Sequence, residues 1–558
     1  MNKILAAFLW ILGTSVFSQI APDVYLVNFA DKQNSPFSID LPQDFLSQRS
    51  INRRTRFQIS ITEQDLPVNP SYIQGVRNFV PSILTVSKWF NSVSINTNNP
   101  ESLDSIRSLP YVRSIKSTCT SQGIPVYPDK LNISAVKASN IQASLPDTSY
   151  YNYGQGSHQI GMIKGHILHN QGYQGQGMVI AVLDGGFTGA DNNPAFDSLW
   201  KNHQILGTWD FIKNTPVSFH EHPHGAWVLS IMAANLPGQM VGTAPKAGYY
   251  LLRTEYGPTE YLLEEDYWIS GAEYADSVGA DLINSSISYT TFDDSTMNHT
   301  YQDMDGNTTR ITKAADIAAS KGILVVTSAG NKGDSPWRYI GAPADADSVL
   351  TVGAVDAERI YASFSSIGPT INGRVKPNLA AQGDGTAFVA TDGNIYTGNG
   401  TSFSSPLICG LAACLWQSNR SVNNYDLIQL MQETGSQALN PDFYLGYGLP
   451  DFSKAFFDVQ GIEIDNIQEN SLLRIFPNPF YSSFTIDYYA PKPEPLVLEI
   501  WDLTGRLVYR EEHDPGYNSF QRIKISGLEN LNPGIFITRI TTSQSVTQAR
   551  IMKQRTRQ

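Results

Sequence analysis

Three residues of the types used in nucleophilic hydrolysis, Asp184, His224 and Ser402, each stand beside a predicted helix or at the end of a predicted strand. Asp184 ends an apolar run and is followed by two glycines, which let the backbone turn sharply. An imidazole at the start of a helix, as at His224, can titrate near neutral pH. A serine in that position, as at Ser402, can be a nucleophile whose own amide helps to bind an oxyanion.

Each residue also has a simpler structural explanation. Asp184 could be a turn residue, and Ser402 could only cap its helix. Asn331, in VVTSAGN (325–331), could be a turn residue or could donate to a developing negative charge. What favours catalysis is the combination: Asp184, His224 and Ser402 follow in the chain order of subtilisin, with gaps of 40 and 178 residues and Asn331 between the last two.

The predicted strands and helices around these residues indicate one large α/β domain. Apolar strand-like runs alternate with helical segments, which predicts a parallel sheet covered on both faces, a doubly wound fold. Function in such sheets sits at the carboxyl ends of the strands, where Asp184 lies. The predicted strands are VIAVLD (179–184), YYLLRT (249–254), DLINSSIS (281–288), ILVVTSAG (323–330) and VLTVGAV (349–355), and the predicted helices include 225–236, 260–279 and 313–322.

This stretch resembles the subtilisin-like serine proteases, the subtilases. The resemblance runs from about Gln155 to Ala455, through GYQGQGMVIAVLDGG, HGAWVLSIMAA, VGTAPKAGYYLLR, SAGN, SVLTVGAVDAERIYASFSSIGP, KPNLAAQG and GTSFSSP. The chain departs from the family pattern at Gly185 (usually Thr or Ser), Ala226 (usually Thr) and residues 403–405 (usually Met-Ala-Ala or Met-Ala-Thr). None of these departures removes a reacting group, so they bear on specificity and rate.

The resemblance implies a serine endopeptidase that acts on proteins or peptides through an acyl-enzyme. Ser402 would attack the peptide carbonyl, His224 would carry the proton to the leaving amine, and Asp184 would orient the imidazole. Asn331 and the Ser402 amide would hold the oxyanion. Two further segments match the substrate-binding walls, one of which pairs in β fashion with an extended peptide. They are Ser286, Ile287 and Ser288, and Ser328, Ala329 and Gly330.

The resemblance implies no required cofactor, although family members often bind a structural calcium ion. The run 303–307 (DMDGN) has oxygen spacing suited to calcium but lacks the glutamate at the twelfth position, so a solvated turn is the preferred interpretation. His220, His222 and His224 alternate like zinc ligands on one side of a strand. No cysteine or carboxylate with ligand spacing accompanies them, so His220 and His222 are most simply solvated loop residues.

The flanks divide the chain further. Residues 1–18 have a positive start, a short apolar stretch and small residues before a cut, which predicts a Sec signal peptide. Residues 19–120 form an α+β unit that resembles a protease propeptide, a partner that would inhibit the enzyme. Residues 121–155 look like an exposed linker holding the maturation site, and the protease domain would cover 156–458. Residues 459–558 alternate in short runs, which predicts an all-β sandwich.

The sandwich resembles the type A sorting domain of the type IX secretion system of Bacteroidetes. The likeness is carried by IFPNPF (475–480), IWDLTGRLVY (500–509), LNPGIFITRI (531–540) and the basic end ARIMKQRTRQ. It implies Sec export to the periplasm, translocation by the type IX machinery, and release from the cell or display on its surface. The alternative is an ordinary sandwich that binds carbohydrate or protein.

Composition excludes several classes. A net charge of −12 and a pI near 5.2 argue against nucleic acid or an anionic membrane as a partner. No run of about 20 apolar residues predicts a transmembrane helix. Cys119, Cys409 and Cys414 are too few for a disulfide framework, and no pattern suits a catalytic thiol. The alternatives to a protease are an inactive subtilase-fold binding protein and an adhesin that works through its sandwich.

Overall fold

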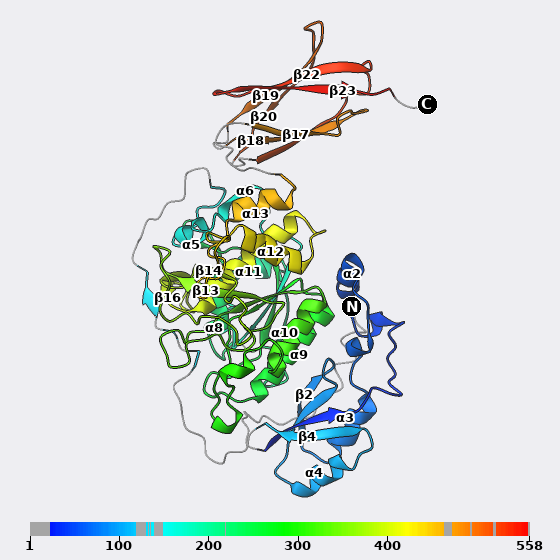
Figure 1. The fold of residues 1–558 in the computed structure, drawn as a ribbon, viewed down its shortest axis with the longest axis vertical. Coiled ribbons are helices and arrows are strands. Elements are labelled where there is room, and N and C mark those ends of the chain that lie inside the picture. Colours follow the sequence, from blue (N-terminus) through cyan, green and yellow to red (C-terminus); the bar gives the residue numbers. More distant parts are fainter. Residues whose placement is uncertain are drawn as a thin grey trace.

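The structure, a computed structural model, describes residues 23–118, 130–131, 133, 135–138, 149–217, 219–462, 471–490, 494–516 and 520–555. The predicted signal peptide, Cys119 and much of the predicted linker lie outside these ranges. A large central domain occupies the middle of the molecule, with a small N-terminal unit against one side and a β-sandwich at the other end of the long axis (Figure 1).

Seven parallel strands form the sheet of the central domain. They are β6 (Val179–Asp184), β7 (Ile205–Asp210), β10 (Gly248–Arg253), β11 (Leu282–Ser285), β12 (Leu324–Ser328), β13 (Leu350–Val355) and β14 (Leu379–Gln382). Their order is β14-β13-β12-β11-β6-β10-β7, with all neighbours parallel. Successive side chains of β6 enter two separate cores, as Val182 and Leu183 do, because strand side chains alternate between faces. The predicted doubly wound fold is thereby confirmed.

Helices cover both faces of the sheet. The core on one face contains α8 (His224–Ala233) and α11 (Thr401–Ser418), and the core on the other contains α9 (Leu263–Val278) and α10 (Arg310–Ser320). Gly279, at φ 84°, ends α9 in the left-handed conformation that glycine adopts without strain. The other helices of the domain are α5 (Ser157–Gly161), α6 (His166–Asn170), α7 (Asp197–Lys201), α12 (Asn424–Glu433) and α13 (Phe452–Val459), with 3₁₀ turns at Pro194–Phe196, Ser295–Met297 and Tyr301–Asp303.

Part of the predicted linker is built into the central domain. Strand β5 (Ala135–Lys137) pairs antiparallel with β16 (Ile395–Gly398), which also forms a hairpin with β15 (Thr386–Val389). Leu131 is only 7% exposed. The segment is therefore not an exposed linker throughout, because Leu131 is buried and β5 pairs with the domain, although Val136 of that strand stays exposed. A second, short hairpin joins β8 (Asn235–Leu236) to β9 (Met240–Val241).

The N-terminal unit is a four-stranded antiparallel sheet with three helices, in agreement with the predicted α+β unit. The strands are β1 (Val24–Phe29), β2 (Ser82–Ser87), β3 (Ser92–Asn96) and β4 (Val112–Ser117), in the order β2-β3-β1-β4, and the helices are α2 (Gln48–Phe57), α3 (Pro70–Arg77) and α4 (Pro100–Arg107), with 3₁₀ turns at Pro42–Asp44 and Glu63–Asp65. Helix α2, which the sequence analysis did not predict, contacts α9, and so does β2.

The C-terminal unit is the predicted β-sandwich. One sheet has the order β17-β18-β21 and the other β20-β19-β22-β23, around a core of its own. The strands are β17 (Ser471–Phe476), β18 (Phe484–Tyr489), β19 (Leu496–Asp502), β20 (Leu507–His513), β21 (Phe520–Ile525), β22 (Gly534–Thr541) and β23 (Val546–Lys553). The basic end of the chain thus supplies a strand, β23, that its composition did not predict.

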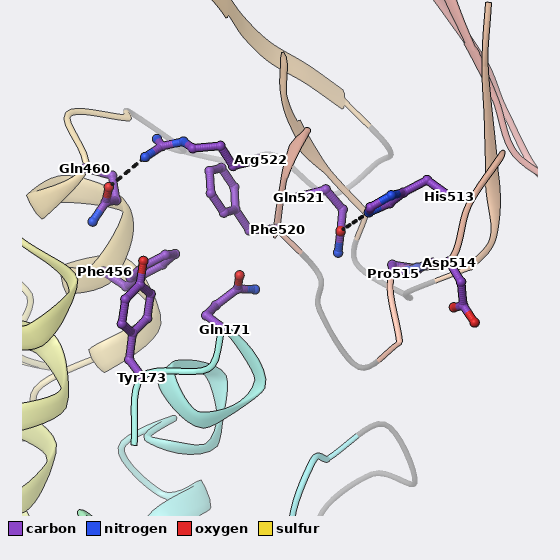
Figure 2. A pocket seen from close by; sticks show the side chains of 10 residues that line it. All are labelled: Gln171, Tyr173, Phe456, Gln460, His513, Asp514, Pro515, Phe520, Gln521 and Arg522. Carbon is purple, nitrogen blue, oxygen red and sulfur yellow. Dashed lines mark hydrogen bonds between the residues drawn. The ribbon is translucent and has the colours of Figure 1, made fainter. Parts of the chain in front are cut away.

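The sandwich rests on α13 of the central domain. The ring of Phe520 lies 5.7 Å from that of Phe456 and 5.5 Å from that of Phe457, between centroids. Arg522 donates to the side chain of Gln460 at 3.2 Å. Around these contacts lies an open cavity of about 360 Å³, with Gln171 on its central-domain side (Figure 2). Among the residues described, no helix is long and apolar enough to cross a membrane.

Candidate active site

Asp184 and His224 meet at the carboxyl edge of the sheet. Asp184 is the last residue of β6 and is fully buried, and His224 is the first residue of α8. Nδ1 of His224 lies 2.7 Å from Oδ1 of Asp184. Since an ionised carboxylate can only accept, Nδ1 carries the proton, and Nε2 of the neutral imidazole is left as an acceptor. The Gly185 amide also donates to Oδ1, at 2.7 Å, and fixes the carboxylate.

Two glycines make this close approach possible. A Cβ on Gly225 would lie 2.9 Å from Cβ of Asp184 and 2.5 Å from the carbonyl oxygen of Gly186. Gly186 itself has φ 153°, and a Cβ there would lie 2.5 Å from the backbone nitrogen of His222. Helix α8 can therefore begin directly against the end of β6 only with glycine at both positions.

Ser402 lies in the first turn of α11, on the same edge of the sheet. Its side chain is buried, with the residue 4% exposed, and Oγ has no hydrogen-bond partner among the described residues. Its carbonyl oxygen accepts from Oγ of Ser286 at 3.0 Å, which ties α11 to the end of β11. The Thr401 amide at the start of the helix donates to Oδ1 of Asn331, whereas the Ser402 amide is left to face an anion.

Asn331 follows β12 and is oriented by the start of α11. Its Oδ1 accepts from the amide and the hydroxyl of Thr401, at 2.9 and 2.8 Å. Nδ2 is consequently the free donor end of the amide. A Cβ built on Gly400 would lie 2.9 Å from Oγ of Ser402, 3.4 Å from Nδ2 of Asn331 and 3.8 Å from the Ser402 amide nitrogen. The hydroxyl and the two donors therefore border one small space.

The two predicted substrate segments lie beside each other. Sheet pairing of β11 ends at Ser285, earlier than the predicted strand 281–288, so residues 286–288 continue beyond it. Oγ of Ser328 donates to the carbonyl of Ile287 at 3.4 Å. Gly330, at φ 100°, leaves no room for a side chain, because a Cβ would lie 2.7 Å from Oγ of Ser288. These contacts make one continuous wall next to α11.

Several residues considered as metal ligands make hydrogen bonds within their own loops. Nδ1 of His222 accepts from the amide of His224 at 3.1 Å. The carboxylate of Asp303 accepts from the amide of Thr300, and that of Asp305 accepts from the amides of Asn307 and Thr308. These are turn and cap contacts within residues 300–308. Cys409 and Cys414 are buried free thiols, and burial raises the pKa of both.

Sequence reasoning missed two clusters. One joins Arg53 and Arg54 of α2 to Asp276 of α9, and a concentration of four arginines in residues 49–56 was its only signal. The other brings Glu255, Glu260 and Glu264 together, the only group with metal-like spacing among the residues described. Three glutamates within ten residues after a strand were the available signal for it.

Comparison with known proteins gives the family. Residues 175–448 match the Subtilase family, and residues 24–130 match the peptidase S8 propeptide domain of Bacteroidota. Residues 175–448 are a subtilase domain. Residues 474–554 match the secretion system C-terminal sorting domain. The enzyme is thus a serine-type endopeptidase, and its type IX sorting domain indicates secretion or a cell-surface location.

Several curated relatives are subtilisins. Subtilisin DY from Bacillus licheniformis is 29% identical over 297 residues, which cover 52% of this chain and 94% of that protein. Subtilisin NAT from Bacillus subtilis subsp. natto is 29% identical over 295 residues, covering 52% and 68%. Among solved structures, MycP1 from Mycobacterium smegmatis aligns with 21% identity and a TM-score of 0.44, over 62% of this chain and 93% of that one.

Proposed function

We propose that Ser402, His224 and Asp184 are the nucleophile, general base and orienting carboxylate of this endopeptidase, with Asn331 and the Ser402 amide as its oxyanion hole. The observation that carries the proposal is the 2.7 Å bond between His224 and Asp184, because it leaves Nε2 free to accept a proton. The unbonded, buried hydroxyl of Ser402 beside the Asn331 amide supports it further.

In this mechanism Oγ of Ser402 attacks the carbonyl carbon of the substrate while Nε2 of His224 takes its proton. Asp184 stabilises the imidazolium that results. Nδ2 of Asn331 and the Ser402 amide donate to the oxyanion, and His224 then gives the proton to the leaving amine. Water, activated by His224, hydrolyses the acyl-enzyme ester and frees Ser402. The chemistry calls for no metal or organic cofactor, although a structural calcium ion is compatible with it.

The substrate is held as an extended strand against residues 286–288, with Ser328, Ala329 and Gly330 walling the pocket for the side chain before the cut bond. Extended peptides add to an unpaired segment through main-chain hydrogen bonds. The end of β11 supports this role, since sheet pairing stops at Ser285 and the following residues continue alongside Ser328.

A fluorophosphonate probe tests the nucleophile, because it labels only an activated serine. We expect the purified mature enzyme to be labelled and the Ser402→Ala variant to be neither labelled nor active, with a loss in turnover on the order of 10⁶, as in subtilisin. Ser418→Ala, at the far end of the same helix, is the control and should keep both properties. Peptide hydrolysis by folded Ser402→Ala protein would contradict the assignment and leave an inactive binding protein or adhesin as the alternative.

The N-terminal unit acts as an inhibitory propeptide, and maturation cuts the chain between about Ser117 and Gln155. The match of residues 24–130 to a propeptide domain supports this order of events. N-terminal sequencing of the secreted enzyme should give a start inside that interval. A fully active enzyme that starts at Gln19 would refute the proposal.

A further inference from the structure

Three glutamates form an acidic cluster next to the active site. Glu255 follows β10, Glu260 lies in the loop after it, and Glu264 is in the first turn of α9. One carboxylate oxygen from each glutamate lies within 4.8 Å of one oxygen from each of the other two. Burial raises the pKa of Glu255 well above its usual value and that of Glu260 to about 7, and the neighbouring carboxylates add to both shifts. Such a cluster is unfavourable unless a cation compensates it.

The cation in this structure comes from a different part of the chain. Nζ of Lys130 lies 2.9 Å from Glu255, 2.7 Å from Glu260 and 2.7 Å from Glu264. The ammonium also lies 5.6 Å from the ring centroid of Tyr289, whose hydroxyl donates to Glu255. An aromatic face beside three carboxylates suits an ammonium or guanidinium group better than a hydrated metal ion.

The main chain of Lys130 is bound as well. Its amide donates to the carbonyl of Gly257 at 3.1 Å. The next side chain, Leu131, covers Gly185: a Cβ there would lie 2.1 Å from Cδ1 of Leu131. Gly185 directly follows Asp184, so the residue after Lys130 lies beside the backbone next to Asp184.

The chain continues past the nucleophile. Cγ2 of Ile133 lies 3.4 Å from the position a Cβ of Gly398 would take, and Phe403, the neighbour of Ser402, borders the same position. Two residues further on, β5 pairs with β16, the strand that leads to α11. Leu131 therefore lies beside the residue that follows Asp184, and Ile133 lies beside a position that Phe403 also borders. If the bond presented to Ser402 lies between Leu131 and Ile133, Lys130 is the second or third residue before it.

We propose that the acidic cluster of Glu255, Glu260 and Glu264 is a substrate subsite for the side chain of Lys or Arg, two or three residues before the cleaved bond, and that Lys130 fills it in the uncut chain. The inference rests on the proposed peptidase function and names its substrate class: proteins with a basic residue at that distance from the cut. Glu264 is held ready for this task by the amides of Tyr256 and Tyr261, at 3.0 and 2.9 Å.

The first experiment measures selectivity in the mature enzyme. Fluorogenic peptides that differ only in Lys, norleucine or Glu, at the second or third position before the cut, are compared by kcat/KM. We expect at least a tenfold preference for Lys over norleucine at one of the two positions. Glu260→Gln should lower that ratio about tenfold, and Glu260→Lys should turn the preference toward Glu. Glu358→Gln, an exposed turn residue, is the matched control and should keep the wild-type ratio.

The second experiment does not depend on peptidase activity. In the full chain carrying Ser402→Ala and Lys130→Ala, the acidic cluster loses its ammonium, and n-butylammonium can take its place. We expect this ion, but not n-butanol, to raise the Tm of the double variant by more than that of Ser402→Ala alone. Calcium chloride in its place tests a divalent cation site.

The outcomes separate the two proposals. Equal kcat/KM for Lys and norleucine in an active enzyme, or an unchanged ratio in Glu260→Gln, would overturn the subsite while the peptidase stands. An inactive wild-type enzyme that still shows selective stabilisation by n-butylammonium would keep the cation site and refute the proposed catalysis. Equal stabilisation by n-butylammonium with and without Lys130, or selective stabilisation by calcium alone, would overturn the basic-side-chain subsite.

Discussion

Asp276 of α9 is the anionic centre of the contact with the N-terminal unit, and its replacement should weaken that contact strongly. The carboxylate is fully buried and lies 2.6 Å from Arg53, 2.9 Å from Arg54 and 3.2 Å from Lys88. Burial by itself would raise its pKa, but Arg54, Lys88 and Arg53 hold that pKa far below the usual 3.8. All three cations belong to the N-terminal unit.

Asp276→Asn keeps the size of the side chain and removes its charge. Removing one partner from a buried ion pair costs about 3–5 kcal/mol, because the remaining charge is left buried without compensation. Arg54 keeps Asp65, at 2.8 Å, so the lower half of that range applies best. At about 1.4 kcal/mol per factor of ten, the N-terminal unit should bind on the order of 10²–10³-fold more weakly.

The assay adds residues 19–131 in trans to the mature enzyme and derives Ki from the progress curves of a fluorogenic peptide. Asp276→Asn should raise Ki by the stated factor. Its kcat/KM without inhibitor should stay within about twofold of wild type, since Asp276 is at the end of α9 remote from Glu264 and the active site. Glu433→Gln, an exposed position on α12, is the control and should leave Ki unchanged.

The same interaction sets a pH dependence. The pKa of Asp276 is lower in the bound state than in the free enzyme, so its stabilising contribution is present above the ordinary value of 3.8 and is lost only as pH falls through the lowered one. The increase in Ki caused by Asp276→Asn should therefore be constant between pH 8 and pH 5. A Ki within tenfold of wild type across this range would refute the account of Asp276 as the anchor.

Three further predictions concern the central domain. Asn331→Ala should lower kcat about 10²–10³-fold with little change in KM; wild-type turnover would make Asn331 only a turn residue. Burial lowers the pKa of His169 to about 4, so the unfolded chain alone gains its proton as pH falls from 6.5 to 4. The free energy of unfolding, measured with urea, should fall by up to about 3 kcal/mol between pH 6.5 and pH 4, and by less in the His169→Gln variant. The variant that lacks residues 471–558 should still hydrolyse peptides, and its Phe456 should become exposed. In the native host it should remain in the periplasm, and normal export would contradict the sorting role.

The sandwich is linked to the end of α11 that is remote from Ser402. Ser402 lies in the first turn of this helix, whereas Gln460, the partner of Arg522 in the sandwich, donates to the carbonyl of Ser418 at its last turn. At 1.5 Å per residue the two ends are about 24 Å apart. Loss of activity in the folded truncation would mean that the sandwich supports the central domain across that distance.

Much of the fold could be predicted because its strands carry an uninterrupted apolar signal. VIAVLD, for example, is buried throughout as β6, as a central parallel strand must be. The edge strand β7 reads ILGTWD and only one of its six residues is buried, so its pattern does not stand out from a loop. Helix α2 was missed for a related reason: QRSINRRTRF has no apolar stripe, and its buried face consists of Ser50, Arg53 and Arg54.

The candidate site could be predicted where chain order and local sequence carry the signal, as for Asp184, His224 and Ser402. The acidic cluster could not, because its meaning depends on Lys130, which is 125 residues upstream of Glu255 in the chain. No periodicity relates them, and only the tertiary structure brings the ammonium to the carboxylates. The burial of Leu131 could not be predicted for the same reason, because a single leucine in a polar stretch does not indicate which part of the protein covers it.

Helix α9 contacts both parts of the chain that are proposed to inhibit the enzyme. Its first turn, at Glu264, holds Lys130 of the segment beside the active site. Its last turn, at Asp276 and Ser277, holds α2 of the N-terminal unit. In the uncut chain each contact raises the effective concentration of the other. A cut between Leu131 and Ile133 removes neither contact, so the cleaved unit should stay bound through Asp276 until it is itself degraded. We therefore expect cleavage and activation to be separate steps, with the interval between them set by the strength of the Asp276 contact.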